Sequence, residues 1–234
     1  MMCRMIGFIS FEKKELHPYF KALEEQALHG KGGPHGDGWG MVAYGDQSLL
    51  MRKSAKPVWE ASLNEGTADV ALFHARQASF KGAELRLSHP FVHEMNGEIW
   101  AFAHNGTIQN LAPFASDDEI DTQIYSKLFI SYLKNDTPVN AARRTVQEII
   151  KIAKSEFTSL NAIIINAHQM LTFRIVQKDP DDYHTLFYSE RSDSLTVSTE
   201  KFGEDEWTLL ENGEYLFASK FDSKIDFEVG KIFK

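Results

Sequence analysis

Cysteine is almost absent from this chain of 234 residues: Cys3 stands alone, so no intramolecular disulfide can form, which fits a reducing compartment. No apolar run approaches the roughly 20 residues of a membrane helix, and the initial apolar stretch is too short for a secretion signal. Basic residues are fewer than acidic ones, 25 against 33, and they are scattered. That balance argues against a nucleic-acid footprint. We expect a soluble, cytoplasmic protein with no membrane or nucleic-acid partner.

The composition is otherwise that of an ordinary globular protein, with 43% hydrophobic and 25% charged residues. We see no internal repeat, no low-complexity segment and no linker that would divide the chain. The length is compatible with one domain. We therefore expect a single domain over residues 1–234.

Hydrophobic periodicity predicts strands at both ends of the chain and helices between them. A buried strand of roughly six residues is expected within residues 1–10, and Asn96-Gly97 has the signature of a tight hairpin turn. Helices are expected at 13–30, 122–133 and 139–154. Further strands are expected at 41–44, 69–75, 91–95, 98–103, 162–165, 171–176, 185–188, 195–198 and 215–218. Antiparallel strands with segregated helices indicate the α+β class.

Residues 30–40 are the most glycine-dense part of the sequence and must form a loop. The segment Gly-Asp-Gly-Trp-Gly at 36–40 runs directly into a strand, which is typical of close backbone approach at a strand mouth. It is not a phosphate-binding loop, because no Gly-Lys-Ser/Thr follows it and no helix begins there.

Cys3 becomes the first residue if translation starts at Met2 and that methionine is removed. It would then carry a thiol and a free α-amine on one carbon, and the amine, with a pKa of about 7.7–8.0, could accept the thiol proton. The alternative is a buried structural cysteine, the commoner state of a lone cysteine.

Three other stretches place reactive groups at strand ends or in loops. Arg76 follows a buried strand, and its guanidinium group could bind a carboxylate with two hydrogen bonds or could simply extend into solvent. Asn105 and Gly106 could form an ordinary turn or donate hydrogen bonds to a developing oxyanion. Asp121, in an acidic run before a helix, could cap that helix or bind a substrate ammonium group.

The order of these motifs resembles the class II glutamine amidotransferases, which are N-terminal nucleophile (Ntn) hydrolases. The matching elements are the near-terminal cysteine, Gly-Asp-Gly-Trp-Gly, His-Ala-Arg-Gln-Ala-Ser, Ser-His-Pro-Phe, His-Asn-Gly and a following Asp-Thr. They cover roughly residues 3–130. The resemblance implies a four-layer αββα sandwich, two antiparallel sheets flanked by helices.

The resemblance also implies the chemistry. Cys3 would attack the side-chain amide of glutamine with its own α-amine as base, and Asn105 and Gly106 would form the oxyanion hole. Ammonia would leave, and water would hydrolyse the γ-glutamyl thioester. No metal and no cofactor is expected.

For substrate binding, the family pattern implies that Arg76 binds the α-carboxylate and Asp121 the α-ammonium group. Ser79 and His89 match pocket positions less closely.

Departures from the better-known members concern Gln77, Ser79, Phe80-Lys81 and Gln123, and they make the pattern similar to a small stand-alone branch. No acceptor domain is expected in the chain. Ammonia would then pass to a partner protein, or the reaction would be simple hydrolysis. A γ-glutamyl amide other than glutamine could also be the substrate.

Two alternatives compete with this interpretation. A catalytically silent amino-acid-binding subunit on the same fold agrees with the Met1-Met2 extension, because an internal Cys3 has an amide nitrogen that cannot act as a base. We expect the form that retains Met1 to be inert. A metal site at His89 and His93, with His104, would need a helix, whereas Pro90 and the Asn96-Gly97 turn favour strand.

Overall fold

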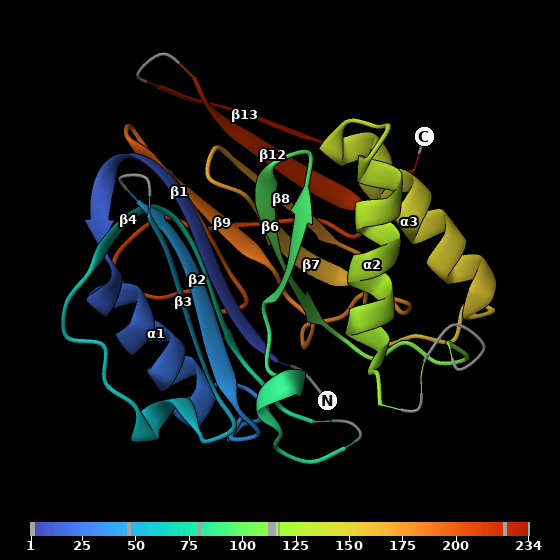
Figure 1. Cartoon of the computed structure of the whole chain (residues 1–234), viewed down its shortest axis with the longest axis horizontal. Helices are drawn as coiled ribbons and strands as arrows, with labels where there is room; N and C mark the ends of the chain where they lie inside the picture. The colour runs from blue at the N-terminus through green and yellow to red at the C-terminus, as the bar shows by residue number, and fades with distance from the viewer. Residues whose placement is uncertain are drawn as a thin grey trace.

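The computed structural model describes residues 3–45, 48–78, 81–111, 116, 118–221 and 224–233. Two antiparallel sheets lie face to face, with one helix on the outside of the first and two helices on the outside of the second (Figure 1). The expected α+β class and the αββα sandwich are therefore confirmed.

The first sheet has seven strands in the order β11-β9-β10-β1-β4-β2-β3. Their bounds are β1 Arg4–Glu15, β2 Trp39–Gly45, β3 Ser48–Ser54, β4 Thr67–Ala75, β9 Phe187–Arg191, β10 Ser194–Ser198 and β11 Thr208–Leu209. The amino-terminal strand is thus central, between a strand from the first third of the chain and one from the last.

The second sheet has six strands in the order β13-β12-β8-β7-β6-β5. Their bounds are β5 Phe91–Met95, β6 Glu98–Asn105, β7 Asn161–Ile165, β8 Gln169–Arg174, β12 Glu214–Phe221 and β13 Lys224–Lys231. The helices are α1 Leu16–His29, α2 Asp121–Leu133 and α3 Pro138–Ile152, with short 3-10 turns η1 Val58–Glu60 and η2 Leu85–Leu87. Within the described residues, no helix has the length and apolar character needed to cross a membrane.

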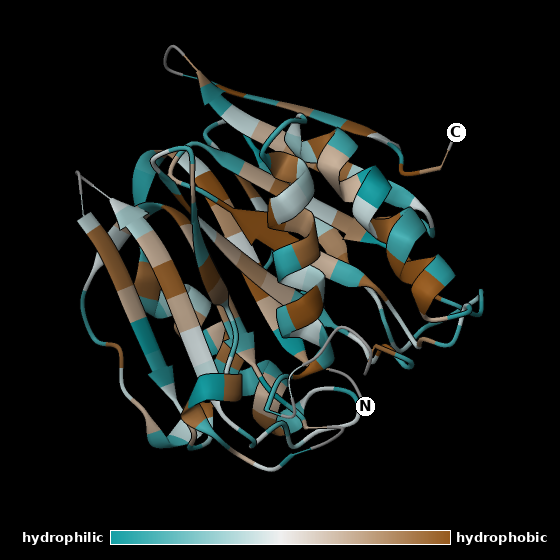
Figure 2. Ribbon diagram, turned by 45° about the vertical axis from the view of Figure 1, so that its right-hand side comes forward, coloured by the Kyte–Doolittle hydropathy of each residue, from teal (hydrophilic) through white to brown (hydrophobic). Residues whose placement is uncertain are grey.

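Three separate apolar cores hold the four layers together. One lies between α1 and the first sheet, one between the two sheets, and one between the second sheet and α2 with α3. Figure 2 shows the corresponding hydrophobic bands along the central strands and on the helices. Gly7 of β1 lies at the contact between the sheets, where a Cβ would approach Ile163 Cγ2 to 2.9 Å. A glycine there lets the two sheets pack closely.

The elements differ from the prediction at several places. The first strand continues to Glu15, so α1 begins three residues later than expected, because Lys14 and Glu15 pair with the start of β4. Strands β11 and β13 were not predicted, since both are edge strands without a buried residue and without a strong apolar pattern. The Asn96-Gly97 turn is confirmed, with φ of 55° and 79°, values typical of a type I′ hairpin.

Candidate active site

Cys3 lies at the start of central strand β1, where the carboxyl ends of β4 and β6 and the amino terminus of α2 also meet. The Cys3 side chain is buried, 7% exposed. Its backbone nitrogen donates a hydrogen bond of 2.7 Å to Asn105 Oδ1, and its sulfur lies 3.8 Å from the carbonyl oxygen of Gln77. Strand register therefore brings residue 3 to the motif at 104–106.

The pKa of the Cys3 thiol is raised to about 11, chiefly by burial, and a backbone hydrogen bond with Gln77 and the Arg76 charge only partly oppose this. A thiol with this pKa is almost entirely protonated near neutral pH. It needs a base beside it before it can act as a nucleophile.

Asn105 closes β6 and has its two amide atoms in different environments. Oδ1 accepts the hydrogen bond from Cys3, whereas Nδ2 is buried and has no hydrogen-bond partner among the described residues. A buried amide donor without a partner costs free energy, about 1–3 kcal/mol, unless another group accepts from it. The Asn105 amide N–H thus has no described acceptor in the protein, and its oxyanion role stays a prediction.

Gly106 follows with φ of 151°, a conformation that side-chain-bearing residues rarely adopt. A Cβ at this position would lie 2.0 Å from the Ser159 carbonyl oxygen and 2.9 Å from His104 Nε2. Only glycine fits. The chain here does not turn back as a two-residue hairpin but continues to Ile108, which bridges to Phe157.

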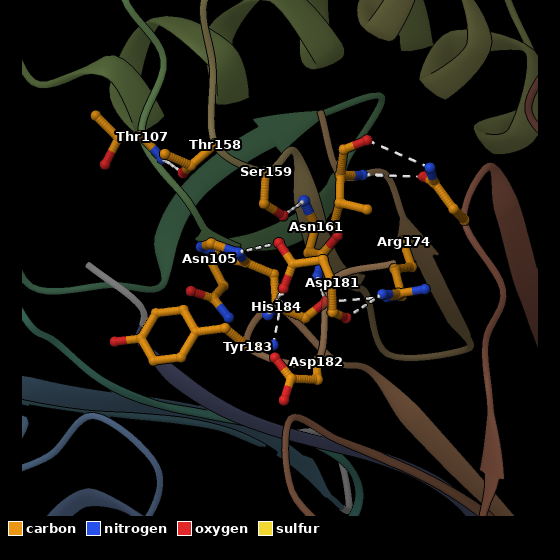
Figure 3. Close-up of polar contacts among 12 residues, drawn as sticks. Asn105, Thr107, Thr158, Ser159, Asn161, Arg174, Asp181, Asp182, Tyr183 and His184 are labelled. Atoms are coloured by element: carbon orange, nitrogen blue, oxygen red, sulfur yellow. Dashed lines mark hydrogen bonds and ion pairs between the residues drawn. The ribbon is translucent and has the colours of Figure 1, made fainter. Parts of the chain in front are cut away.

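The segment before β7 forms a support for this loop (Figure 3). Thr107 N donates to Thr158 Oγ1, and Thr158 N donates to the Thr107 carbonyl, both at 3.0 Å. The Ser159 carbonyl accepts a 3.0 Å hydrogen bond from His104 Nε2. Asn161, paired with Asn105 in the sheet, donates through Nδ2 to the His184 carbonyl at 3.0 Å.

Arg174 holds the loop that contains His184 (Figure 3). Its buried guanidinium donates to the carbonyl oxygens of Asp181 at 2.7 Å, His184 at 3.0 Å and Leu210 at 3.4 Å. The oxyanion candidates therefore rest on a network of backbone carbonyls and buried side chains that leaves them little freedom to move.

Arg76, at the end of β4, is buried and lines the same cavity as Cys3. Its Nη1 donates to the Gly82 carbonyl at 2.8 Å and its Nη2 to the Lys81 carbonyl at 3.1 Å. The guanidinium thus holds the loop that follows it. An arginine has five N–H donors, so a substrate carboxylate could share the group with these carbonyls.

Asp121 is the first residue of α2 and carries its carboxylate into the cavity. Oδ2 accepts from Ile108 N at 2.8 Å, and Oδ1 accepts from Thr122 N at 2.7 Å. Each oxygen keeps further acceptor capacity, and the helix amino terminus favours the negative charge. Asp121 therefore stabilises its helix and remains able to bind a cation.

His89 lies against His74 and Phe91, at ring-centroid distances of 4.1 and 4.9 Å. Burial lowers the pKa values of both His74 and His89 well below the usual range, so both rings are neutral at physiological pH. His93 points elsewhere and contacts Ser126. Of the three histidines of the hypothetical metal site, His93 therefore lies apart, whereas His89 and His104 both line the cavity.

The cavity has a volume of about 640 Å³. Its walls include Cys3, Arg76, His89, Gly106 and Asp121, so the structure brings these predicted residues together. Ser79, the remaining predicted contact, lies outside the described residues.

Sequence reasoning gave no role in the amidotransferase site to His104 and Thr122, which also line the cavity. Each directly neighbours a predicted site residue, and that adjacency was the only signal available.

An ion pair between Arg4 and Glu200 connects the start of β1 with the last third of the chain. The buried Arg4 guanidinium forms an ion pair with Glu200 at 2.5 Å and also donates to the Lys31 carbonyl. Glu200 accepts from Lys31 N at 2.7 Å, and Gln77 Nε2 donates to the Gly32 carbonyl at 3.1 Å. The glycine-rich loop is therefore hydrogen-bonded both to Arg4, which follows Cys3, and to Gln77, whose carbonyl oxygen lies near the Cys3 sulfur.

Comparison with known proteins gives one family match. The model of the family "Glutamine amidotransferases class-II" matches residues 2–123, just over half of the chain. A protein of Haemophilus influenzae named "Putative glutamine amidotransferase" is 23% identical, over 93% of this chain and 84% of its own.

Two solved structures share the fold. An allosteric regulatory enzyme of purine biosynthesis superposes with a TM-score of 0.70 at 18% identity, over 98% of this chain and 49% of its own. This chain thus spans about half the length of that enzyme. A predicted glutamine amidotransferase from Pseudomonas aeruginosa superposes with a TM-score of 0.61 at 19% identity, over 92% of this chain and 96% of its own.

Proposed function

This chain belongs to the class II glutamine amidotransferases, and we propose that it cleaves the side-chain amide of glutamine or of another γ-glutamyl amide. The observation that carries this proposal is the pairing of Cys3 N with Asn105 Oδ1 while Asn105 Nδ2 stays buried without a described partner. A nucleophile, its nitrogen and an oxyanion donor are then within reach of one substrate carbonyl.

In the proposed mechanism Cys3 is the first residue of the mature chain. Its α-amine takes the thiol proton, and the thiolate attacks the amide carbon of the substrate. The oxygen becomes negatively charged and accepts from Asn105 Nδ2 and from the Gly106 backbone N–H. The amide C–N bond then breaks, and the ammonium of Cys3 returns the proton to the departing amine.

The γ-glutamyl thioester formed in this way is hydrolysed by water. The α-amine of Cys3 takes a proton from the attacking water, the C–S bond breaks, and glutamate leaves with the thiol restored. The raised thiol pKa supports the need for the amine, because the buried thiol would otherwise stay protonated.

Arg76 and Asp121 would hold the amino-acid end of the substrate by its two opposite charges, which fixes the amide over Cys3 before reaction. His89 would form part of the pocket wall, and Ser79 would contribute from the loop after Arg76. The amine side of the substrate is less restricted, so γ-glutamyl amides larger than glutamine belong to the proposal. Ammonia would be released in the cytoplasm or passed to a partner protein.

A second candidate is a silent binding subunit, and it follows from the state of the Cys3 nitrogen. In a chain that keeps residues before Cys3, this nitrogen is a peptide amide and cannot accept the thiol proton. With a thiol pKa of about 11, such a form would bind the substrate without cleaving it.

The test is glutamate release from L-glutamine by protein whose amino-terminal Cys3 has been verified by mass. A Cys3→Ala variant and the form that retains Met1 serve as controls. We expect release only from the processed wild type. Release by the Met1 form would refute the amine-base mechanism.

Binding of L-glutamine by the Cys3→Ala variant should persist, measured by calorimetry. Binding without turnover in correctly processed wild type would favour the silent subunit. Neither binding nor turnover of glutamine would remove glutamine as the substrate and direct the assay to γ-glutamyl amides of larger amines.

A further inference from the structure

His104 is held in a single neutral tautomer by the carbonyl oxygen of Ser159. A carbonyl can only accept, so His104 Nε2, 3.0 Å away, must carry the proton. In the neutral ring Nδ1 is then an acceptor. Burial lowers the pKa of His104, although the Asp121 carboxylate partly opposes this, so the neutral form is the relevant one near pH 7.

The hydroxyl of Thr122 has two acceptors and only one proton to give. His104 Nδ1 lies 2.9 Å from Thr122 Oγ1, and Asp121 Oδ1 lies 3.3 Å from it. Because neutral His104 offers a lone pair at the shorter distance, the Thr122 proton points to the imidazole. Asp121 Oδ1 then receives only the Thr122 backbone N–H, at 2.7 Å.

We infer that Thr122 is a positioning residue, which together with neutral His104 keeps one oxygen of Asp121 available for the α-ammonium group of the substrate. This inference rests on the proposed function. The hydroxyl presents a lone pair rather than a proton towards Asp121 Oδ1, so this oxygen receives one hydrogen bond fewer from the protein. A substrate ammonium supplies the missing donor.

Protonation of His104 would reverse this arrangement. Nδ1–H would then donate to Thr122 Oγ1, and the hydroxyl proton would turn to Asp121 Oδ1. The carboxylate would gain an internal donor and a positive charge behind it, and both weaken its hold on an ammonium group.

Among the described residues, the other groups around His104 do not offer it a second carboxylate. Tyr125 packs edge-on from α2, His89 Nδ1 faces its backbone nitrogen, and His74 and His184 act on it electrostatically from β4 and from the loop after β8. Asp121 is thus the acidic group to which the protonation of His104 is coupled. We expect KM for glutamine to rise as the pH falls through the pKa of His104.

The experiment compares wild type with Thr122→Val and Thr122→Ser, using L-glutamine and glutaramic acid, which has the carboxylate and the amide but lacks the α-ammonium group. Thr122→Val removes the hydroxyl through which protonation of His104 reaches Asp121, so it should lose most of the acid-side rise of KM for glutamine, with KM and kcat near the wild-type values at neutral pH. The kcat/KM for glutaramic acid should stay at the wild-type value. Thr122→Ser should retain the acid-side rise of KM.

Thr145→Val is the matched control, since Thr145 is a buried threonine whose hydroxyl donates to the Ala141 carbonyl inside α3. It should leave both substrates unaffected. Equal losses for glutamine and glutaramic acid in Thr122→Val would show a merely structural role and overturn the inference, as would an acid-side rise of KM for glutamine in Thr122→Val as large as that of the wild type. Failure of the wild type itself to bind or cleave glutamine would instead overturn the proposed function, and with it this inference.

Discussion

Asn105 presents its two amide atoms to two different groups. Oδ1 accepts a hydrogen bond from the Cys3 nitrogen, and the buried Nδ2 has no partner among the described residues. Such an arrangement suits a donor that acts only when charge develops on the substrate oxygen.

We predict that Asn105→Ala lowers kcat for glutamine hydrolysis about 10²- to 10³-fold with little change in KM, because the lost donor acts mainly in the transition state. Steady-state kinetics checks this. Asn140→Ala, at an exposed position of α3, is the control and should retain full activity. A rise in KM at constant kcat would mean that Asn105 only binds the substrate.

The elements show how close packing at a few positions sets the shape of the molecule. The absence of a side chain at Gly7 lets the two sheets pack closely. The absence of a side chain at Gly106 lets the backbone of the loop at 105–107 lie next to the Ser159 carbonyl. Both positions exclude a Cβ for steric reasons, one by packing between layers and the other by packing within the site.

We predict that Gly7→Ala lowers the free energy of unfolding by about 1–3 kcal/mol, because the added methyl group overpacks the inter-sheet core against Ile163 and Met170. Urea denaturation measures the change. Gly82→Ala should change the free energy of unfolding only a few tenths as much as Gly7→Ala does, since no atom lies within 4 Å of a Cβ at that position. Equal effects of the two substitutions would contradict the packing argument.

Periodicity and turn chemistry predicted most elements, because apolar repeats and Asn-Gly turns are local signals. They could not predict that Lys14 and Glu15 extend β1, since this depends on pairing with β4, which is distant in sequence. Only those site residues that belong to a short sequence motif could be predicted. Nothing local in the sequence shows that Thr122 stands between His104 and Asp121, because the helix start and the strand end meet only in the fold.

At the scale of the whole molecule, the first strand depends on the last third of the chain. Strand β1 pairs with β10, and Arg4, beside the candidate nucleophile, forms its ion pair with Glu200. The buried guanidinium has no other carboxylate partner among the described residues.

We therefore expect Glu200→Gln to destabilise the protein by about 2–3 kcal/mol, because it leaves a buried cation without its counter-ion, moderated by the partial exposure of Glu200. Chemical denaturation would measure it. Glu190→Gln, at an exposed position of β9, is the control. A loss of stability no greater than that of the control would show that the hydrogen bonds from Arg4 to backbone carbonyls are enough to stabilise the buried guanidinium.

The central place of β1 has a consequence for the order of events during synthesis. Residues 6–10 can complete their pairing only after residues 194–198 have left the ribosome. Until then the start of the chain is open to the peptidases that trim nascent proteins, whereas afterwards Cys3 and Arg4 are buried. Because Cys3 and Arg4 are buried only in the completed sheet, we expect an aminopeptidase to expose Cys3 faster in chains that end before residue 194 than in the folded full-length protein, as intact mass would show.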